Sequence, residues 1–188
     1  MLHCCPTMHP ERMESPFPDV RWGAERSPLR KPFIALSATT VGSALVKALT
    51  PIDRRLLLKS GGRLTVLGPI GAPVLLLTTT GRKSGLLRTT PLLYARDGKR
   101  VCVVGSNFGQ SRHPLWSDNL MAHAHATVRI GSTDIEVTAT LLEGAERERM
   151  WKAFVAVART YDAYRGRTTR DLRMFALNAV TTPSTTSR

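Results

Sequence analysis

The stretch VLLLTTTGRKSGLLRTTP, residues 74–91, decides the fold because it has the pattern of a β-hairpin. An apolar run is followed by three threonines, a short segment bounded by two glycines, and a second arm that ends at Pro91. Apolar or β-branched arms around such a link predict two paired strands. We expect them over about 73–80 and 86–96.

The turn of this hairpin is rich in cations. Arg82, Lys83 and Arg88 lie at or beside it, together with Ser84 and the N–H groups of the loop. Fixed cations and backbone donors that face the same way suit a ligand with phosphate or several carboxylates. A basic turn that is merely solvated has the same spacing, so this alternative stays open. A Walker-type phosphate loop is excluded, because Arg82 stands where that motif requires Gly.

Length and charge limit the classes of protein and of partner. A chain of 188 residues with 42% apolar residues suits one domain with a real core. The formal net charge of +13 indicates an anionic partner, which includes nucleic acid, an acidic membrane surface and a polyanionic small molecule. Charge alone does not choose among these three.

The cysteines indicate a reducing compartment. Cys4 and Cys5 are adjacent and Cys102 lies inside a predicted strand, so no disulfide framework is expected. The chain opens with no charged-then-apolar leader, and no run approaches the roughly 18 apolar residues of a spanning helix. We therefore expect a cytoplasmic protein.

The composition divides the chain into three parts. Residues 1–36 contain six of the twelve prolines without periodicity and are expected to form a disordered extension. Residues 37–180 are expected to form a single domain, and residues 181–188 a flexible tail.

Two short helices are expected at the start of the domain, over about 38–49 and 51–59. The second is basic and amphipathic, with cations at Arg54, Arg55 and Lys59. Such a helix either packs its apolar stripe on its own domain or lies on an anionic membrane surface.

The rest of the chain predicts further strands and helices. Strands are expected over about 100–105, 127–130, 133–142 and 173–180, and helices from Pro114 onward and over about 145–160. The apolar run of the strand at 100–105 indicates burial on both faces. About six mostly antiparallel strands with helices outside favour a mainly β, α+β class and a small, partly open barrel.

Metal-dependent and nucleophilic chemistry have no recognisable pattern here. The histidines at 113, 123 and 125 match no strong zinc spacing, so no metal site is expected. No Gly-x-Ser-x-Gly motif occurs. Tyr161 and Tyr164 are spaced to share a helix face, either as core residues or as phenols at the mouth of a pocket. Trp116 allows the same two interpretations.

The run LLLTTTGRKSGLLRTTPLLYARDGKRVCVVGSNFGQSRHPLWSDNL, with NLMAHAHATVRIG and the later YDAY, resembles the deazaflavin-dependent nitroreductase family over about residues 64–180. The motifs occur in the order and spacing of that family. The resemblance implies a split β-barrel that binds coenzyme F420, a 5-deazaflavin whose side chain ends in a phosphate and a glutamate tail. It also implies hydride transfer from the reduced coenzyme to a quinone, a nitroaromatic or another activated alkene.

The resemblance implies roles for individual residues. Phosphate and tail would be bound by Arg82, Lys83, Ser84 and Arg88. The strand end and loop along the deazaflavin would be Val104, Gly105, Ser106 and Asn107, and the helix on the other side would contribute Leu115, Trp116 and Asn119. Ser106 and Tyr161 would lie near the reacting face, where a hydroxyl can stabilise or protonate the acceptor. Since a deazaflavin has its own reactivity, the protein needs no metal or nucleophile.

Four positions depart from the family pattern. Asn107 stands where the family often has Lys, which removes one cationic contact, and Phe108 stands where Gly is common, which narrows the pocket. Leu93 and Ala158 occupy places where some members have Tyr. These departures bear on the choice of substrate.

Three other functions remain as alternatives. One is an oxidoreductase that uses FMN on the same barrel, and another is a cofactor carrier without turnover. The third is a basic nucleic-acid-binding module, but aromatics are only 6% of residues and form no paired platform, so no nucleic-acid partner is expected. The protein is expected to be a monomer or a homodimer.

Overall fold

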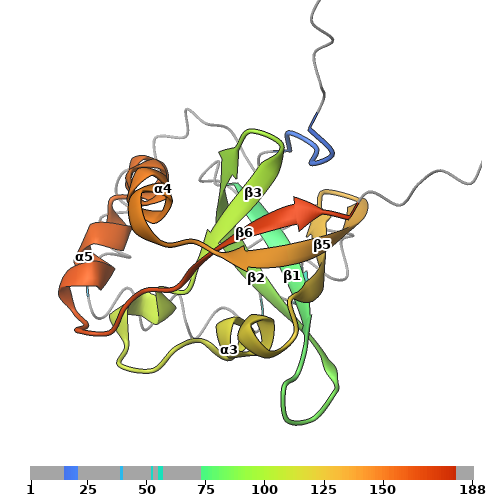
Figure 1. The fold of residues 1–188 in the computed structure, drawn as a ribbon, viewed down its shortest axis with the longest axis horizontal. Helices are drawn as coiled ribbons and strands as arrows, with labels where there is room; N and C mark the ends of the chain where they lie inside the picture. The colour runs from blue at the N-terminus through green and yellow to red at the C-terminus, as the bar shows by residue number, and fades with distance from the viewer. Residues whose placement is uncertain (1–14, 21–38, 40–51, 53–54, 57–72, 181–188) are drawn as a thin grey trace, which may run out of the picture.

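The computed structural model describes residues 15–20, 39, 52, 55–56 and 73–180, and Figure 1 shows their arrangement. The strands are β1 (Val74–Thr80), β2 (Leu87–Asp97), β3 (Arg100–Val104), β4 (His125–Ile130), β5 (Thr133–Leu141) and β6 (Met174–Ala179). The helices are η2 (Asn107–Gly109, 3-10), α3 (Leu115–Ala122), α4 (Gly144–Val157) and α5 (Thr160–Gly166).

The six strands form a closed barrel in the order β1-β2-β3-β6-β5-β4. Every neighbouring pair is antiparallel, and β1 closes the barrel by pairing with β4 as well as with β2. The mainly β class with flanking helices is confirmed. The barrel is closed rather than partly open, because the register Leu77↔Val128 lets β1 satisfy a second partner along its other edge.

Alternation along β3 confirms the predicted burial on both faces. Val101 and Val103 point into the barrel, whereas Cys102 and Val104 belong to a second apolar cluster outside it. Burial raises the pKa of the Cys102 thiol to about 12, so this cysteine is an inert, unpaired core residue.

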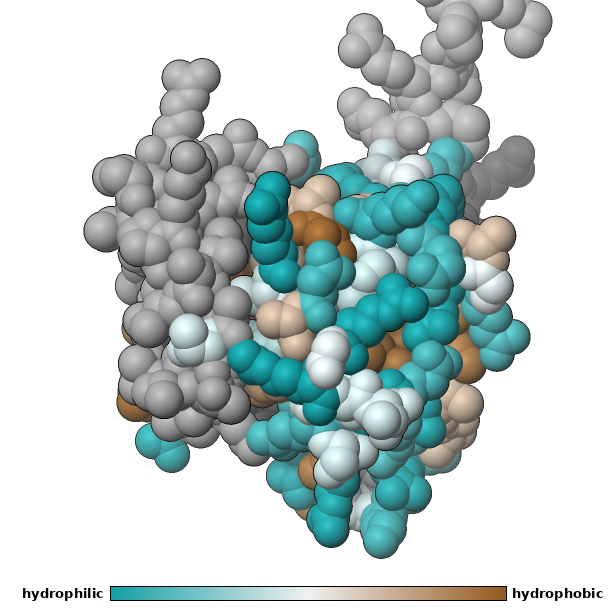
Figure 2. Space-filling model, turned by 90° about the vertical axis from the view of Figure 1, so that its left-hand side faces the viewer, coloured by the Kyte–Doolittle hydropathy of each residue, from teal (hydrophilic) through white to brown (hydrophobic). Residues whose placement is uncertain are grey.

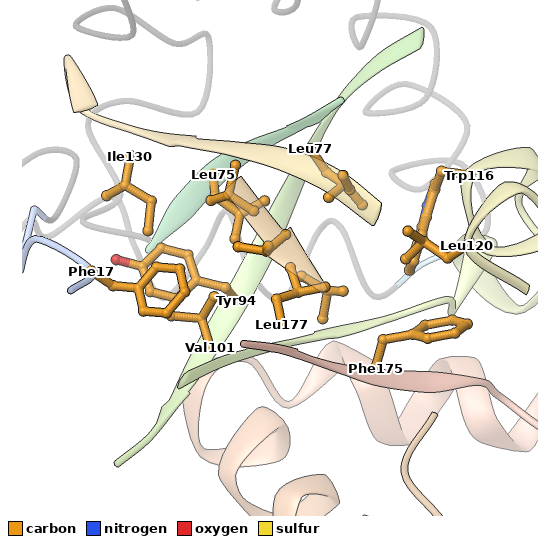
Figure 3. Close-up of a cluster of buried hydrophobic side chains, with 14 residues drawn as sticks. Phe17, Leu75, Leu77, Tyr94, Val101, Trp116, Leu120, Ile130, Phe175 and Leu177 are labelled. Atoms are coloured by element: carbon orange, nitrogen blue, oxygen red, sulfur yellow. The ribbon is translucent and has the colours of Figure 1, made fainter. Parts of the chain in front are cut away.

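The barrel interior is filled at both ends by residues from outside the sheet. Figure 3 shows Phe17, from the segment 15–20, beside the strand residues Tyr94 and Val101 at one end of the cluster. At the other end, Trp116 from α3 lies beside Phe175 of β6. Closing the barrel therefore requires two plugs that are not strands, the segment 15–20 and helix α3.

The segment 15–20 corrects part of the expectation for the N-terminus. Phe17 is only 1% exposed, and Nη2 of Arg96 donates to the carbonyl oxygens of Phe17 (2.9 Å) and Pro18 (2.5 Å). The Tyr94 hydroxyl donates to the Val20 carbonyl oxygen at 3.4 Å. These six residues belong to the barrel domain rather than to a disordered extension, because apolar burial and charge-assisted bonds hold them there. The rest of residues 1–36 lies outside the described residues.

Helices α4 and α5 cover one outer side of the barrel (Figure 1). They replace the single helix expected over 145–160. The backbone of Ala158 is extended (φ −153°, ψ 114°), so α4 ends there and α5 begins as a separate helix. Trp151, Phe154 and Tyr161 pack beneath them in the second cluster, with Cys102 among their neighbours. Figure 2 shows that hydrophilic residues predominate among the described residues on the outside of this face.

The helices expected over 38–49 and 51–59 fall outside the described residues except at isolated positions, among which Ile52, Arg55 and Leu56 are helical. The tail 181–188 is also outside them. None of the helices in the described part of the chain has both the length and the apolarity that crossing a bilayer would require.

Candidate functional site

The predicted hairpin exists, and its turn is closed by backbone hydrogen bonds. The N–H of Gly81 donates to the carbonyl oxygen of Leu86 at 2.9 Å, and the N–H of Gly85 donates to that of Gly81 at 2.7 Å. Gly85 has φ +66°, a conformation that other residues rarely adopt, which explains a glycine there. The Ser84 hydroxyl accepts the Leu86 N–H at 3.3 Å, so its first role is within the turn.

The three cations of the turn have different surroundings. Arg82, Lys83 and Arg88 are all exposed. Nη2 of Arg82 lies 3.4 Å from Oδ2 of Asp118, so its charge is partly compensated. Lys83 and Arg88 form no ion pair with any residue that the structure describes, and their charges are open to an anionic ligand.

Helix α3 anchors this turn through Asn119. Its Oδ1 accepts the Arg82 N–H at 3.0 Å, and its Nδ2 donates to Oγ1 of Thr79 at 3.0 Å. Asn119 and Thr79 are both buried. The side chain that the resemblance assigned to the cofactor is thus engaged with the hairpin, and it positions the cationic turn.

The other two α3 residues assigned to the cofactor differ sharply in exposure. Trp116 is 6% exposed and meets the ring of Phe175 edge-to-face, with 5.9 Å between centroids, inside the barrel cluster. Leu115 is 75% exposed. Of the pair, only Leu115 offers a free apolar surface, and the indole is a barrel plug.

The strand end and loop expected beside the deazaflavin follow β3 directly. Val104 and Gly105 are buried, whereas Ser106 and Asn107 are half-buried. The Gly105 N–H donates to the Arg173 carbonyl oxygen at 2.8 Å. Val104 packs under α4 and α5, in a different cluster from Trp116, so these two side chains do not flank a common surface.

Three consecutive residues of this loop are left-handed. Asn107, Phe108 and Gly109 have φ of +44°, +56° and +76°. For the first two this conformation costs of order 1–3 kcal/mol each. The Phe108 ring packs edge-to-face on Tyr164, with 5.8 Å between centroids, and Asn107 Nδ2 donates to the Arg112 carbonyl oxygen at 2.9 Å. Such strain persists only where surrounding contacts determine the backbone.

Arg170 is the residue of this site that sequence reasoning missed. Its guanidinium donates to the carbonyl oxygens of Gly105 (3.0 Å), Ser106 (2.6 Å) and Gln110 (2.7 Å). Nothing in the run RTTRDLR distinguishes it from the other arginines of a strongly basic chain, and its partners lie 60 to 65 positions away.

Tyr161 and Tyr164 lie on one face of α5, as their spacing predicted, with 6.1 Å between ring centroids. Tyr161 also meets the rings of Trp151 and Phe154 edge-to-face and is 5% exposed. Burial raises the pKa of Tyr161 above its ordinary value, so the phenol stays protonated. Tyr161 is a core residue in this structure.

A chain of contacts joins the separate parts into one site. Asp118 on α3 accepts from Arg82 of the hairpin and from Arg173 at 2.8 Å. The backbone of Arg173 in turn binds Gly105. The cationic turn, α3 and the loop after β3 are therefore connected through α3 and Arg173, and the exposed cations Lys83 and Arg88 suit the anionic group of a ligand.

Sequence comparison assigns this chain to a known group. The family model described as F420H(2)-dependent quinone reductase matches residues 47–179. The F420H(2)-dependent quinone reductase Rv1261c of Mycobacterium tuberculosis is 35% identical over 121 residues, which are 63% of this chain and 81% of that protein. The putative F420H(2)-dependent quinone reductase Rv3178 of the same organism is 35% identical over 105 residues, 56% of this chain and 88% of that one.

Solved structures agree with this assignment. An F420-H2 dependent reductase (FDR-A) is 36% identical, with a TM-score of 0.53, and the match covers 56% of this chain and 94% of that one. A structure described as a domain-swapped dimer is 30% identical, with a TM-score of 0.55, and the match covers 71% and 98% of the two chains. The family model extends over most of the described barrel and contains every residue of the site, so this chain belongs to the F420H(2)-dependent quinone reductase family.

Proposed function

We propose that this protein transfers a hydride from reduced coenzyme F420 to a quinone, with nitroaromatics and other activated alkenes as further acceptors. The observation that carries the proposal is the open charge of Lys83 and Arg88 on a turn tied through α3 to the loop that follows β3. Family membership supports the same cofactor and acceptor class.

Lys83 and Arg88 would bind the phosphate and the glutamate carboxylates, with Arg82 and Ser84 beside them. Charge-assisted hydrogen bonds contribute about 1.5–3 kcal/mol each, and exposure to water places these bonds at the low end. Association costs about 4–15 kcal/mol, so the cations alone bind weakly. Contact of the flat ring with the loop Gly105–Asn107 and with the exposed Leu115 must supply the rest of the binding free energy.

The coenzyme supplies the hydride chemistry itself, so the protein's part is to orient the ring, exclude water and stabilise charge. Negative charge that builds on the acceptor oxygen needs a donor nearby. Of the two hydroxyls considered, Ser106 is half-buried and Tyr161 is buried among aromatic rings. We assign the donor role to Ser106, and we assign Tyr161 to supporting the site from the core.

The test is reoxidation of reduced F420 by a panel of quinones and nitroaromatics, followed anaerobically by absorbance. We expect protein-dependent reoxidation with at least one quinone. Reduced F420 that binds without reoxidation across the panel would identify a cofactor carrier instead. A flavin spectrum at longer wavelength in the purified protein, with no F420 binding, would identify an FMN enzyme. A steep salt dependence of DNA binding without any response to F420 would indicate a nucleic-acid module.

We further propose that the protein works in the cytoplasm, as a monomer or homodimer, in contact with anionic membranes where quinones reside. Ile52 and Arg55, which fall in the helix expected over 51–59, are both exposed and support surface contact. The domain-swapped neighbour supports the dimer. Light scattering after size exclusion tests the assembly, and sedimentation with anionic against zwitterionic vesicles tests the membrane contact.

A further inference from the structure

The loop after β3 is held from one side by a single guanidinium. Besides the carbonyl oxygens of Gly105, Ser106 and Gln110, Arg170 Nη1 lies 3.2 Å from Nδ1 of His113. Arg170 therefore contacts the loop at four points, from Gly105 to His113, which lies two residues before α3. Since these contacts span the left-handed stretch, they explain how that backbone keeps its conformation.

Arg170 has neutral partners only. It forms no ion pair with any carboxylate in the described part of the chain. Burial, together with the nearby Arg173, lowers the pKa of Arg170 from its ordinary value. A partly buried cation without an acidic partner costs free energy, and here the hydrogen bonds of the guanidinium go to the loop carbonyls instead of a carboxylate.

Peptide geometry shows which backbone groups of the loop point away from Arg170. In a trans peptide the C=O and the following N–H point opposite ways, and no cis peptide occurs among the described residues. The carbonyls of Gly105 and Ser106 face Arg170, so the N–H groups of Ser106 and Asn107 face away from it. Neither N–H donates to a described residue. Two donors are thereby left for an acceptor on the other side of the loop.

We propose that Arg170 is a positioning residue, which turns the carbonyls of Gly105 and Ser106 toward itself and so aims the N–H groups of Ser106 and Asn107 at the bound deazaflavin. This inference rests on the proposed function. The carbonyl oxygens of the deazaflavin ring are acceptors of the kind that such N–H groups recognise. Arg170 does not touch the ring itself.

The experiment compares Arg170→Ala and Arg170→Lys with Arg147→Ala, by F420 fluorescence titration and steady-state kinetics. Arg147 is a matched control because its guanidinium holds the same segment through Asp171 and the Leu172 carbonyl oxygen, without reaching the loop. We expect Arg170→Ala to weaken F420 binding by at least about tenfold, since two donors lose their orientation. Arg170→Lys should restore part of the affinity, and Arg147→Ala should bind as wild type does.

Two further readouts separate positioning from general destabilisation. The KM for the quinone should stay unchanged in Arg170→Ala while that for F420 rises, because the acceptor is not held by these donors. In the free protein, the amide resonances of Ser106 and Asn107 should shift in Arg170→Ala and not in Arg147→Ala. Equal F420 affinity in wild type and Arg170→Ala, or equal losses in Arg170→Ala and Arg147→Ala, would overturn the proposal. If wild type fails to bind F420, the proposed function fails first.

Discussion

The side chain of Asn119 accepts a hydrogen bond of 3.0 Å from the backbone N–H of Arg82, and so fastens helix α3 to the cationic turn. The same amide donates to Thr79, one residue before the end of β1. A single buried side chain thus bridges the hairpin and the helix that plugs the barrel. The position of the cations therefore depends on this bridge as well as on the hydrogen bonds of the turn itself.

Replacing Asn119 with Ala should destabilise the protein and loosen the turn. The change leaves the Arg82 N–H and the buried Thr79 hydroxyl without partners, which costs about 1–3 kcal/mol. Urea denaturation measures this loss. Asn178→Ala is the control, because its two hydrogen bonds are long, at 3.4 Å, and we expect a change within about 0.5 kcal/mol. Equal stability of Asn119→Ala and wild type would show that the bridge is dispensable.

Lys83→Ala should weaken F420 binding by about tenfold, the equivalent of one charge-assisted hydrogen bond at a water-exposed site. The free lysine has no ion-pair partner in the described structure, so its loss is not offset by releasing a carboxylate. Fluorescence titration at two salt concentrations measures the effect, which should shrink at high salt. Lys99→Ala, in the exposed β2–β3 turn, is the control for loss of charge alone. Matching affinities for both variants would remove the cationic turn from the binding site.

Gly109→Ala should be far more destabilising than Gly98→Ala, although both glycines have positive φ (+76° and +61°). A Cβ on Gly109 would lie 2.9 Å from the Tyr164 carbonyl oxygen and from Cβ of Arg167, whereas one on Gly98 meets nothing within 4 Å. Backbone strain of about 1 kcal/mol is common to both, and the steric clash is added only at Gly109. Thermal unfolding compares them. Equal shifts in Tm would mean that the loop can move away from α5.

His113 should make the protein acid-sensitive. Burial, then Arg173 and Arg170, lower the pKa of His113 below its ordinary 6.5. The unfolded chain therefore binds this proton more readily, so stability falls as pH drops below about 6.5 and through the lower folded value. Asp118 and Asp171 oppose the shift but do not reverse it. We expect the loss of Tm between pH 7.5 and pH 5.5 to be smaller in His113→Asn, and an unchanged loss would contradict the assignment.

Phe17→Ala should cost about 3–5 kcal/mol, as for other buried aromatic residues. The loss arises because Phe17 fills one end of the barrel at 1% exposure. Denaturant unfolding measures it, with Asp19→Ala as a control that removes a partly exposed ion pair to Arg96 and leaves the barrel filling intact. Unchanged stability in Phe17→Ala would mean that the barrel end needs no plug.

Local sequence patterns were sufficient to predict most strands of the sheet. The hairpin 74–91 and the strand Arg100–Val104 were predictable because period-two alternation, apolar runs and Gly-bounded links are properties of adjacent residues. The break at Ala158 was not, because the helical pattern continues across it and only packing of Tyr161 beneath α4 selects the extended residue. The burial of Phe17 was also not predicted, because a proline-rich segment without periodicity does not indicate that one of its residues fills the end of a barrel.

The amino-acid sequence by itself determined the strands, the basic turn and, through resemblance, the family and its cofactor. The tertiary structure decided which polar groups remain free for a ligand. Asn119 bonds to the hairpin, Trp116 packs in the barrel and Tyr161 packs in the core. Lys83, by contrast, stays exposed, and Arg170 contacts a loop that lies 57 or more positions earlier in the sequence. Burial and hydrogen bonding between distant segments arise only on folding, so no local pattern encodes them.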